Sequence, residues 1–218
     1  LGLMPGADLS AVVAGSMPLA EAARPYQPGG FDILPGRSGS GALAALPAAS
    51  FERVLAGLIG LGARYDIVLL DLGAGLERST RRMAGAADTL LVLATEEPAS
   101  LTDAYAVLKL NAADRGTADA RVVVNLAASR AAGERTYATL LGACRNFLGI
   151  APPLSGVVRR DDRVREAIRR QSLLLVRHPA SQAGADVEAM VAGLLAVDER
   201  ARHPPFSIGQ SLATRAHA

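Results

Sequence analysis

The sequence predicts an α/β fold, with a mostly parallel sheet and helices on both faces. Short, uninterrupted apolar runs alternate along the chain with longer segments whose apolar residues recur at helical spacing. Several of these runs end in a polar residue, which is typical of parallel strands at the sheet edge where ligands bind. Half of the 218 residues are apolar, so a substantial core is available. We expect one domain over residues 1–197 and a polar, disordered tail over residues 198–218.

The composition excludes several classes of protein. Cys144 is the sole cysteine, which rules out a disulfide framework or a cysteine zinc site and fits a reducing cytosol. No apolar run approaches the roughly 18 residues that cross a bilayer, and a formal net charge of +2 is too small to argue for nucleic acid. We therefore expect a cytoplasmic protein that does not bind nucleic acid. Peripheral attachment to the inner membrane stays open, although the apolar residues of the tail are too sparse for an amphipathic helix.

The first third of the chain predicts three helices and a short strand. Residues 9–14, capped by Asp8, and residues 19–23 have helical patterns, and residues 31–34 (FDIL) are typical of a strand. The loop GRSGSGAL at residues 36–43 has no lysine, so it does not match G-x-x-x-x-G-K-[ST], and we interpret it as a flexible connection. A third helix is expected after Ser50 as its cap, with an apolar stripe made of Phe51, Val54, Leu55, Leu58 and Ile59.

Residues 65–76 (YDIVLLDLGAGL) combine an apolar run, a carboxylate and a glycine-rich turn. The run at residues 67–70 predicts a strand buried on both faces. Asp71 follows it directly, and Gly73 and Gly75 let the backbone turn tightly and approach a bound group. This order is the Walker B arrangement, in which the carboxylate holds a Mg²⁺ that bridges nucleotide phosphates. The same residues also fit an ordinary strand-to-helix turn without a ligand.

Strand and helix alternate over the rest of the chain. We expect strands at residues 89–95, 121–125, 154–158 and 173–176, and helices at residues 77–86, 101–113, 134–148, 161–170 and 184–197. Ser100 with Asp103 resembles a capping box for the helix at 101–113. Thr95, Glu96 and Asn125 map, together with Asp71, to the carboxyl edge of the sheet. The arginines of residues 159–170 fit either a basic patch or a solvated helix face with internal ion pairs, and we favour the second.

Three motifs resemble the MinD/ParA family of P-loop ATPases, and most closely its flagellar-number regulator branch (FlhG/FleN-like). Residues 65–76 resemble that branch's D-T-G-A-G stretch, with Leu72 in place of threonine. LATEEPASLTDAYAVLK resembles its T-P-E-P-T-S-x-T-D-A-Y segment, with Glu96 where a proline is usual. VVVNLAAS and the later GVVRRDDRVREAI resemble the family's adenine-pocket asparagine and its G-x-I-P-x-D-x-x-V segment, with Arg159 in place of the proline.

The resemblance implies ATP and Mg²⁺ as cofactors. Asp71 would be the catalytic residue and would hold the Mg²⁺ through water, and Gly75 would place a backbone N–H near the γ-phosphate. Asn125 would contact the edge of the adenine. The implied cofactor-binding residues are Asp71, Gly73, Gly75, Asn125, Arg159 and Asp161, the last two of which would line the base.

Members of the family begin with a strand and a lysine-rich P-loop, whereas Lys109, in a predicted helix, is the sole lysine of this sequence. The chain therefore resembles the C-terminal four-fifths of such a protein, and we expect an N-terminally truncated P-loop NTPase fold. Because the P-loop lysine and N–H groups neutralise the phosphates, the chain alone is predicted to be inactive as an ATPase.

The function that the resemblance implies is control of flagellar number or placement by an ATP-dependent homodimer. The implied partners are a second copy of the chain, a flagellar signal-recognition-type GTPase, and flagellar switch or transcription components. A chromosome or plasmid partitioning ATPase of the ParA type is one alternative. A non-enzymatic interaction module that has lost its P-loop is the other.

Overall fold

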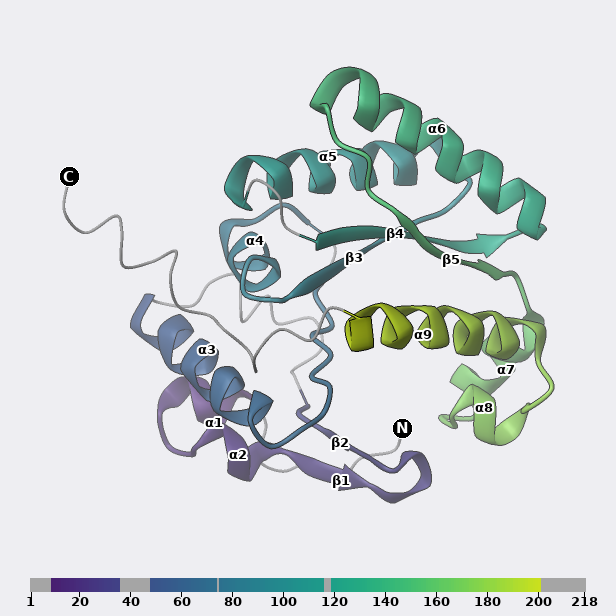
Figure 1. The fold of residues 1–218 in the computed structure, drawn as a ribbon. Helices are drawn as coiled ribbons and strands as arrows, with labels where there is room; N and C mark the ends of the chain where they lie inside the picture. Colours follow the sequence, from purple (N-terminus) through teal and green to yellow (C-terminus); the bar gives the residue numbers. More distant parts are fainter. Residues whose placement is uncertain (1–8, 36–47, 74, 116–118, 201–218) are drawn as a thin grey trace, which may run out of the picture. The chain divides into compact units, whose positions relative to one another are not determined.

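The structure, a computed structural model, describes residues 9–35, 48–73, 75–115 and 119–200. These residues form two compact units, which divide between Ala86 and Ala87 (Figure 1). The domain over residues 1–197 stays a prediction.

The unit of residues 9–86 is mainly helical. Its elements are α1 (Leu9–Ala14), α2 (Leu19–Ala22), β1 (Arg24–Tyr26), the 3-10 helix η1 (Gln27–Gly29), β2 (Phe31–Ile33), α3 (Ala48–Gly62) and α4 (Arg78–Ala84). Strands β1 and β2 pair in antiparallel fashion. The predicted helices and the strand predicted at residues 31–34 are confirmed here. Ser50 is not a cap, because α3 begins at Ala48 and Ser50 lies in its first turn. Asp8 and the loop at residues 36–43 lie outside the described residues.

Helix α3 supplies the core of this unit. Four residues of its predicted apolar stripe are buried, namely Phe51, Val54, Leu55 and Leu58. Ile59 is only partly buried against the same cluster, and Leu61, which was not predicted, is buried. Residues of α1, α2 and α4 complete the same cluster. The guanidinium of Arg82 in α4 lies 4.2 Å from the centre of the Phe51 ring and also forms an ion pair with Glu52, so α4 is attached to α3 by a cation–π contact as well as by charge.

The second unit, residues 87–200, contains a parallel sheet between helices. Its elements are β3 (Thr89–Ala94), α5 (Pro98–Arg115), β4 (Asp119–Ala127), α6 (Arg130–Leu148), β5 (Leu154–Arg159), α7 (Asp162–Arg169), α8 (Leu174–Arg177) and α9 (Gln182–Arg200). The strand order is β3-β4-β5, with parallel pairing throughout. Helices α5 and α6 cover one face of the sheet and α9 covers the other (Figure 1). This confirms the predicted fold class.

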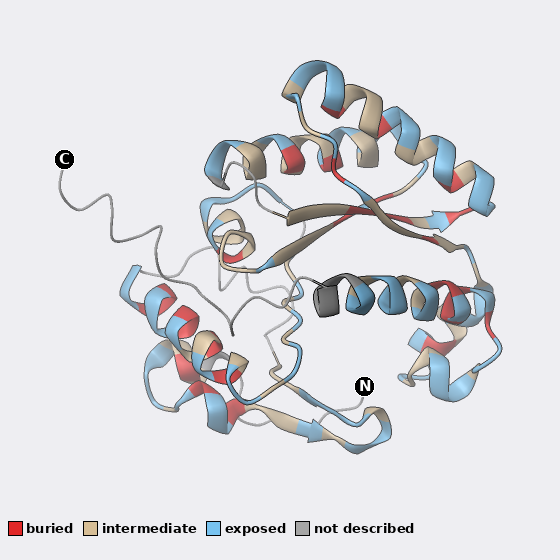
Figure 2. Cartoon of the chain, viewed as in Figure 1, coloured by how far each residue is buried: buried red, intermediate tan, exposed pale blue. Residues whose placement is uncertain are grey.

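The core of the second unit lies between the sheet and helices α5 and α6. Val122, Val123 and Val124 of the central strand β4 are all buried, which agrees with a strand covered on both faces. The buried residues of α5 and α6 face the sheet (Figure 2). On the opposite face, α9 approaches β5 closely at Gly156, where a Cβ would come within 3.0 Å of Met190. Because the three strands are parallel, their carboxyl ends lie at the same edge of the sheet.

Two local predictions for this unit are wrong. Residues 173–176 were expected to be a strand, but Leu173 is the N-cap of the short helix α8, which Arg177 links to Glu166 of α7; a short apolar run does not by itself distinguish the two structures. The capping box of Ser100 is also absent, since α5 begins at Pro98 and the Ser100 hydroxyl accepts a hydrogen bond from the Thr95 N–H.

Helix α9 extends to Arg200, so residues 198–200 of the predicted tail belong to it, and residues 201–218 lie outside the described part of the chain. Within that part, no helix combines the length and the apolar character needed to span a membrane.

Candidate functional site

The Walker B-like segment is extended but unpaired, so the prediction of a buried strand at residues 67–70 is wrong. Ile67 and Leu69 are 64% and 84% exposed. Leu70 and Leu72, on the other side of the extended chain, pack against the α3 cluster. The physical reason is that no strand of the described residues forms a ladder with this segment, so only one of its faces has a partner.

Asp71 lies on the exposed side of this segment, and Gly73 and Gly75 follow it in the turn. Gly75 has φ +135°, a backbone conformation that residues with a Cβ rarely adopt, so the position favours glycine. A Cβ on Gly73 would meet open space. Of the two predicted glycines, only Gly75 is therefore demanded by the backbone conformation.

Strand β4 carries a β-bulge at the predicted adenine-contacting residue. Val124 pairs with Val157 and Ala127 pairs with Arg159, so Asn125 and Leu126 together oppose a single residue of β5. Leu126 has φ +56°, which is uncommon for a branched side chain and costs roughly 1–3 kcal/mol. Strain of this kind is concentrated at functional sites, and here it turns the end of β4 out of the regular ladder.

The Asn125 side chain is only partly engaged by the protein. Its Oδ1 accepts a hydrogen bond of 2.8 Å from the Leu126 N–H. Within the described part of the chain, its amide nitrogen has no hydrogen-bond partner, and the amide oxygen retains a second lone pair. The side chain can therefore still donate one hydrogen bond and accept another at the same edge.

Hydrogen bonds tie the three strand ends to one another. After β3, the Glu96 carboxylate accepts a 2.9 Å hydrogen bond from the Ala128 N–H, which follows β4. After β5, the Arg160 N–H donates a 2.9 Å hydrogen bond to the carbonyl of Ala127. The peptide group between Ala127 and Ala128, directly after the Asn125 bulge, is thus hydrogen-bonded on both of its sides. These bonds link the ends of β3, β4 and β5 to one another.

Arg159 does not extend freely over the edge, because its side chain is bound to Asp186 of α9. The guanidinium donates to both carboxylate oxygens, from Nε at 2.7 Å and from a terminal nitrogen at 2.8 Å. The Arg159 N–H donates to the same carboxylate at 3.0 Å. The Asp186 side chain is 2% exposed, and a guanidinium nitrogen of Arg130 lies 3.7 Å from it. The hydrogen bonds from Arg159 hold the pKa of Asp186 below its ordinary value.

Asp161 is the N-cap of α7 and also holds the first turn of α9. One carboxylate oxygen accepts from the Arg163 N–H at 3.0 Å, and the other accepts from the N–H groups of Gln182 at 2.9 Å and Ala183 at 3.3 Å. Hydrogen bonds from the backbone, that of Arg163 first, lower the pKa of Asp161. Both carboxylate oxygens of Asp161 already accept hydrogen bonds from the backbone. The backbone of the turn, rather than this side chain, is therefore available to line a base.

The structure brings together Asn125, Arg159 and Asp161 at the carboxyl edge of the second unit. Asp71, Gly73 and Gly75 belong to the other unit and form a separate set. Sequence reasoning missed Asp186, whose only signal is an acidic residue on the apolar side of a helix, and it did not assign a bonding role to Glu96. Among the described residues, no group of three or more histidine, cysteine, aspartate and glutamate side chains could hold a metal ion.

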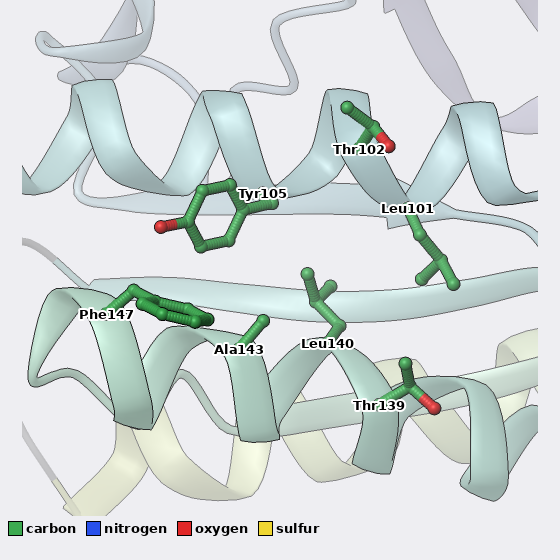
Figure 3. A pocket seen from close by; sticks show the side chains of 7 residues that line it. All are labelled: Leu101, Thr102, Tyr105, Thr139, Leu140, Ala143 and Phe147. Atoms are coloured by element: carbon green, nitrogen blue, oxygen red, sulfur yellow. The ribbon is translucent and has the colours of Figure 1, made fainter.

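A groove of about 320 Å³ lies between α5 and α6. Figure 3 shows Leu101 and Tyr105 of α5 facing Leu140, Ala143 and Phe147 of α6 across it. Phe147 is 76% exposed. The helix layer forms this groove, whereas strand ends carry Asn125 and Arg159, so it is not part of the candidate nucleotide site.

Curated proteins similar to this chain include two flagellar regulators. Antiactivator FleN of Pseudomonas aeruginosa is 30% identical over 190 residues, which are 87% of this chain and 68% of that protein. Flagellum site-determining protein YlxH of Helicobacter pylori is 24% identical over 167 residues, which are 76% of this chain and 56% of that protein. The chain thus spans about two thirds of the first relative and little more than half of the second. No protein-family model matches the chain.

Solved structures share the fold. A ParA family ATPase from Chlorobium tepidum has a TM-score of 0.67 at 19% identity, over 88% of this chain and 78% of its own. The septum site-determining protein MinD of Pyrococcus horikoshii, solved in complex with Mg-ADP, has a TM-score of 0.66 at 18% identity, over 92% of this chain and 77% of its own.

Proposed function

The chain belongs to the MinD/ParA family of ATPases, on its FleN/FlhG-type branch, and from this premise we propose that it acts in an ATP-dependent, homodimeric regulator of flagellar number or placement. The observation that carries the proposal is the bulge at Asn125. A strained strand end at the carboxyl edge presents an amide with an unpaired N–H group, in a fold whose solved relatives include a Mg-ADP complex.

The adenine half of the proposed site fits the chemistry of Asn125. Its free N–H group donates to adenine N7, and the second lone pair of its oxygen accepts from the N6 amine. Guanine presents an acceptor, O6, where adenine has that amine, so the pairing favours ATP over GTP. Arg159 and Asp161 contribute through the backbone of their turn, since their side chains are bound to Asp186 and to the helix N-termini.

The phosphate half fits Asp71 and the turn after it. An exposed carboxylate can hold Mg²⁺ through water, because this ion keeps several of its waters and shares its other ligands with the phosphates. When bound, the ion neutralises charge on the phosphates. The backbone conformation of Gly75, which other residues adopt poorly, suits an N–H group directed at the γ-phosphate. Asp71, Gly73 and Gly75 are therefore proposed as the metal and phosphate residues.

The proposed partners follow from the branch. They are a second copy of the chain, a flagellar signal-recognition-type GTPase, and flagellar switch or transcription components. For its place in the cell we propose the cytoplasm, with peripheral attachment to the inner membrane open to test. The proposed domain over residues 1–197 and tail over residues 198–218 stay predictions, and α9 includes the first three of those tail residues.

A non-enzymatic interaction module is the second candidate function, and one observation favours it. The sequence holds no G-x-x-x-x-G-K-[ST] motif, and Lys109 lies within α5, so no lysine of the chain is placed to neutralise the β and γ phosphates. The ParA-type alternative draws support from the Chlorobium structure at the level of fold alone.

The test compares the chain with a fusion in which the strand and Walker A loop of a MinD-type relative precede Leu1, here called the Walker A fusion. Calorimetry with Mg·ATP is expected to give weak or no binding for the chain alone and micromolar binding for the fusion. Sedimentation should show an ATP-dependent dimer of the fusion, and the matched Asp71→Ala fusion should lose hydrolysis.

Micromolar ATP affinity of the chain alone would refute the phosphate argument. A fusion that folds but neither binds ATP nor dimerises would favour the interaction module. Flagellar counts in a Pseudomonas strain lacking FleN, with and without the fusion, address the biological role; unchanged counts would argue against it.

A further inference from the structure

Three hydrogen bonds join the turn after β5 to one carboxylate on α9. Two come from the Arg159 guanidinium, at 2.7 and 2.8 Å, and the third comes from the Arg159 backbone N–H at 3.0 Å. The bidentate side-chain pair fixes direction as well as distance. The third bond fixes the main chain itself, so Asp186 constrains the backbone of Arg159 and not only its side chain.

The burial of Asp186 makes this link obligatory. Because 2% of its side chain is exposed, the carboxylate is bound by the Arg159 donors instead of water, and a guanidinium nitrogen of Arg130 lies 3.7 Å away. A buried charge that loses its partner is strongly destabilising. Separating Asp186 from Arg159 would therefore leave a buried carboxylate without its main donors.

A second attachment stands two residues further along the turn. The Asp161 carboxylate accepts from the Gln182 and Ala183 N–H groups at the start of α9. The start of α9 is thus hydrogen-bonded to both ends of the turn at residues 159–161. Asp186 binds Arg159, and the N–H groups of Gln182 and Ala183 bind Asp161. Between them, the Arg160 N–H donates to the Ala127 carbonyl, directly after the Asn125 bulge.

We propose that Asp186 is a positioning residue for base recognition: through Arg159 it fixes the turn at residues 159–161 against the Asn125 bulge, and so determines the selectivity for adenine over guanine. This inference rests on the proposed nucleotide function. Asp186 itself touches no base. It acts by keeping the Arg160 to Ala127 hydrogen bond in place, which holds the strand end on which Asn125 is carried.

The departure at position 159 supplies a discriminating variant. The segment that this stretch resembles has proline there, and a proline fixes φ within its own ring and has no N–H group to donate. Arg159 has no ring that fixes its φ. Its backbone is instead held by the hydrogen bond from its N–H to Asp186. Proline at this position should then make Asp186 dispensable for recognition, which a pair serving stability alone would not do.

The experiment uses the ¹⁵N-labelled chain, titrated with AMP and separately with GMP, with the Asn125 side-chain amide and the Leu126 and Arg160 amides followed by NMR. The variants are Asp186→Ala, the double variant Arg159→Pro with Asp186→Ala, and Glu188→Ala as a control for an exposed acidic residue on the same helix. Asp186→Asn, which keeps the volume and one acceptor, serves if the alanine variant does not fold.

For the wild-type chain and for Glu188→Ala we expect a saturable AMP response at Asn125 at concentrations where GMP gives none. Asp186→Ala should lower the preference for AMP about tenfold, because misplacing one paired edge removes much of the discrimination. The double variant should recover most of it. Faster hydrogen exchange of the Arg160 amide in Asp186→Ala alone should accompany the loss.

The two possible failures are distinguishable. If Asp186→Ala folds and prefers AMP as strongly as the wild-type chain, the positioning role is overturned while the adenine site stands. If Asp186→Ala loses the preference for AMP and the double variant does not recover it, the positioning role is also overturned, because the loss is then an effect on stability. If the wild-type chain itself shows no preference at Asn125, the adenine site fails, and the positioning role fails with it.

Discussion

Strand β4 and the segment at residues 67–70 have similar apolar sequences, each followed by polar or small residues, yet they differ in structure. Val122 and Val124 are 0% exposed between two neighbouring strands, whereas Leu69 is 84% exposed in a segment that pairs with none of the described strands. An apolar run specifies what can be buried, and the neighbouring strands decide whether it is.

The same difference separates the two sets of predicted nucleotide-binding residues, one in each unit. Asn125, Arg159 and Asp161 stand on a sheet edge that is cross-linked by hydrogen bonds to Glu96 and Asp186. Asp71 and its glycines lie on an exposed extended segment. The set proposed to recognise the base is therefore preorganised, whereas the set proposed to hold the metal has fewer contacts that fix it.

Two leucine truncations should show the largest contrast between the regions. Leu108, fully buried in the core of the second unit, should lose about 2–5 kcal/mol of unfolding free energy when changed to alanine. Leu69→Ala removes the same atoms from a side chain that is 84% exposed and should cost no more than about 0.5 kcal/mol. Urea unfolding followed by circular dichroism measures both. Equal losses would mean that residues 67–70 are buried after all.

The two glycines that follow Asp71 provide the next contrast. Gly75→Ala should cost about 1–3 kcal/mol, because φ +135° is strained for any residue with a Cβ. Gly73→Ala meets open space and should change stability little. Thermal unfolding of the two variants compares them directly; a tolerated Gly75→Ala would show that this turn has no fixed conformation.

Among the residues proposed to line the base, Asp161→Ala should cost about 1–2 kcal/mol, since it uncaps α7 and the start of α9 together. The exposed Asp103 on α5, changed to alanine, is the control. Hydrogen exchange should be accelerated in the first turns of both α7 and α9. Acceleration in α7 alone would contradict the double cap.

The last contrast concerns the charge of Asp186 and is measured as a dependence of stability on pH. Its pKa is lowered chiefly by the hydrogen bonds from Arg159, with Arg130 as the other facing charge. The stabilisation is therefore complete above the ordinary aspartate pKa of about 3.9 and is lost as the pH falls through the lowered value. The difference in unfolding free energy between the wild-type chain and Asp186→Asn should shrink below pH 4 on this scale. A difference independent of pH would remove the ion pair from the account.

The sequence was a good guide wherever local pattern decides structure. Helical spacing predicted most of the buried face of α3, and apolar runs followed by polar residues predicted β3, β4 and β5, although β4 continues past Asn125 to Ala127. Prediction from the sequence failed where contacts with other elements decide the structure, at residues 67–70 and at α8. It could not reveal the Asp186 to Arg159 pair, because 27 residues separate the two and only the packing of α9 on β5 brings them together.

The central claim is that Asn125 reads adenine at this edge, and the ratio of ATP to GTP affinity of the Walker A fusion tests it most directly. Asn125→Ala should weaken ATP binding by about one to two orders of magnitude, since a buried polar group left unpaired costs about 1–3 kcal/mol, and should narrow the preference over GTP. A folded variant in which both nucleotides bind with an unchanged ratio would contradict the claim and leave Asn125 as a strand-end residue bonded to its own backbone.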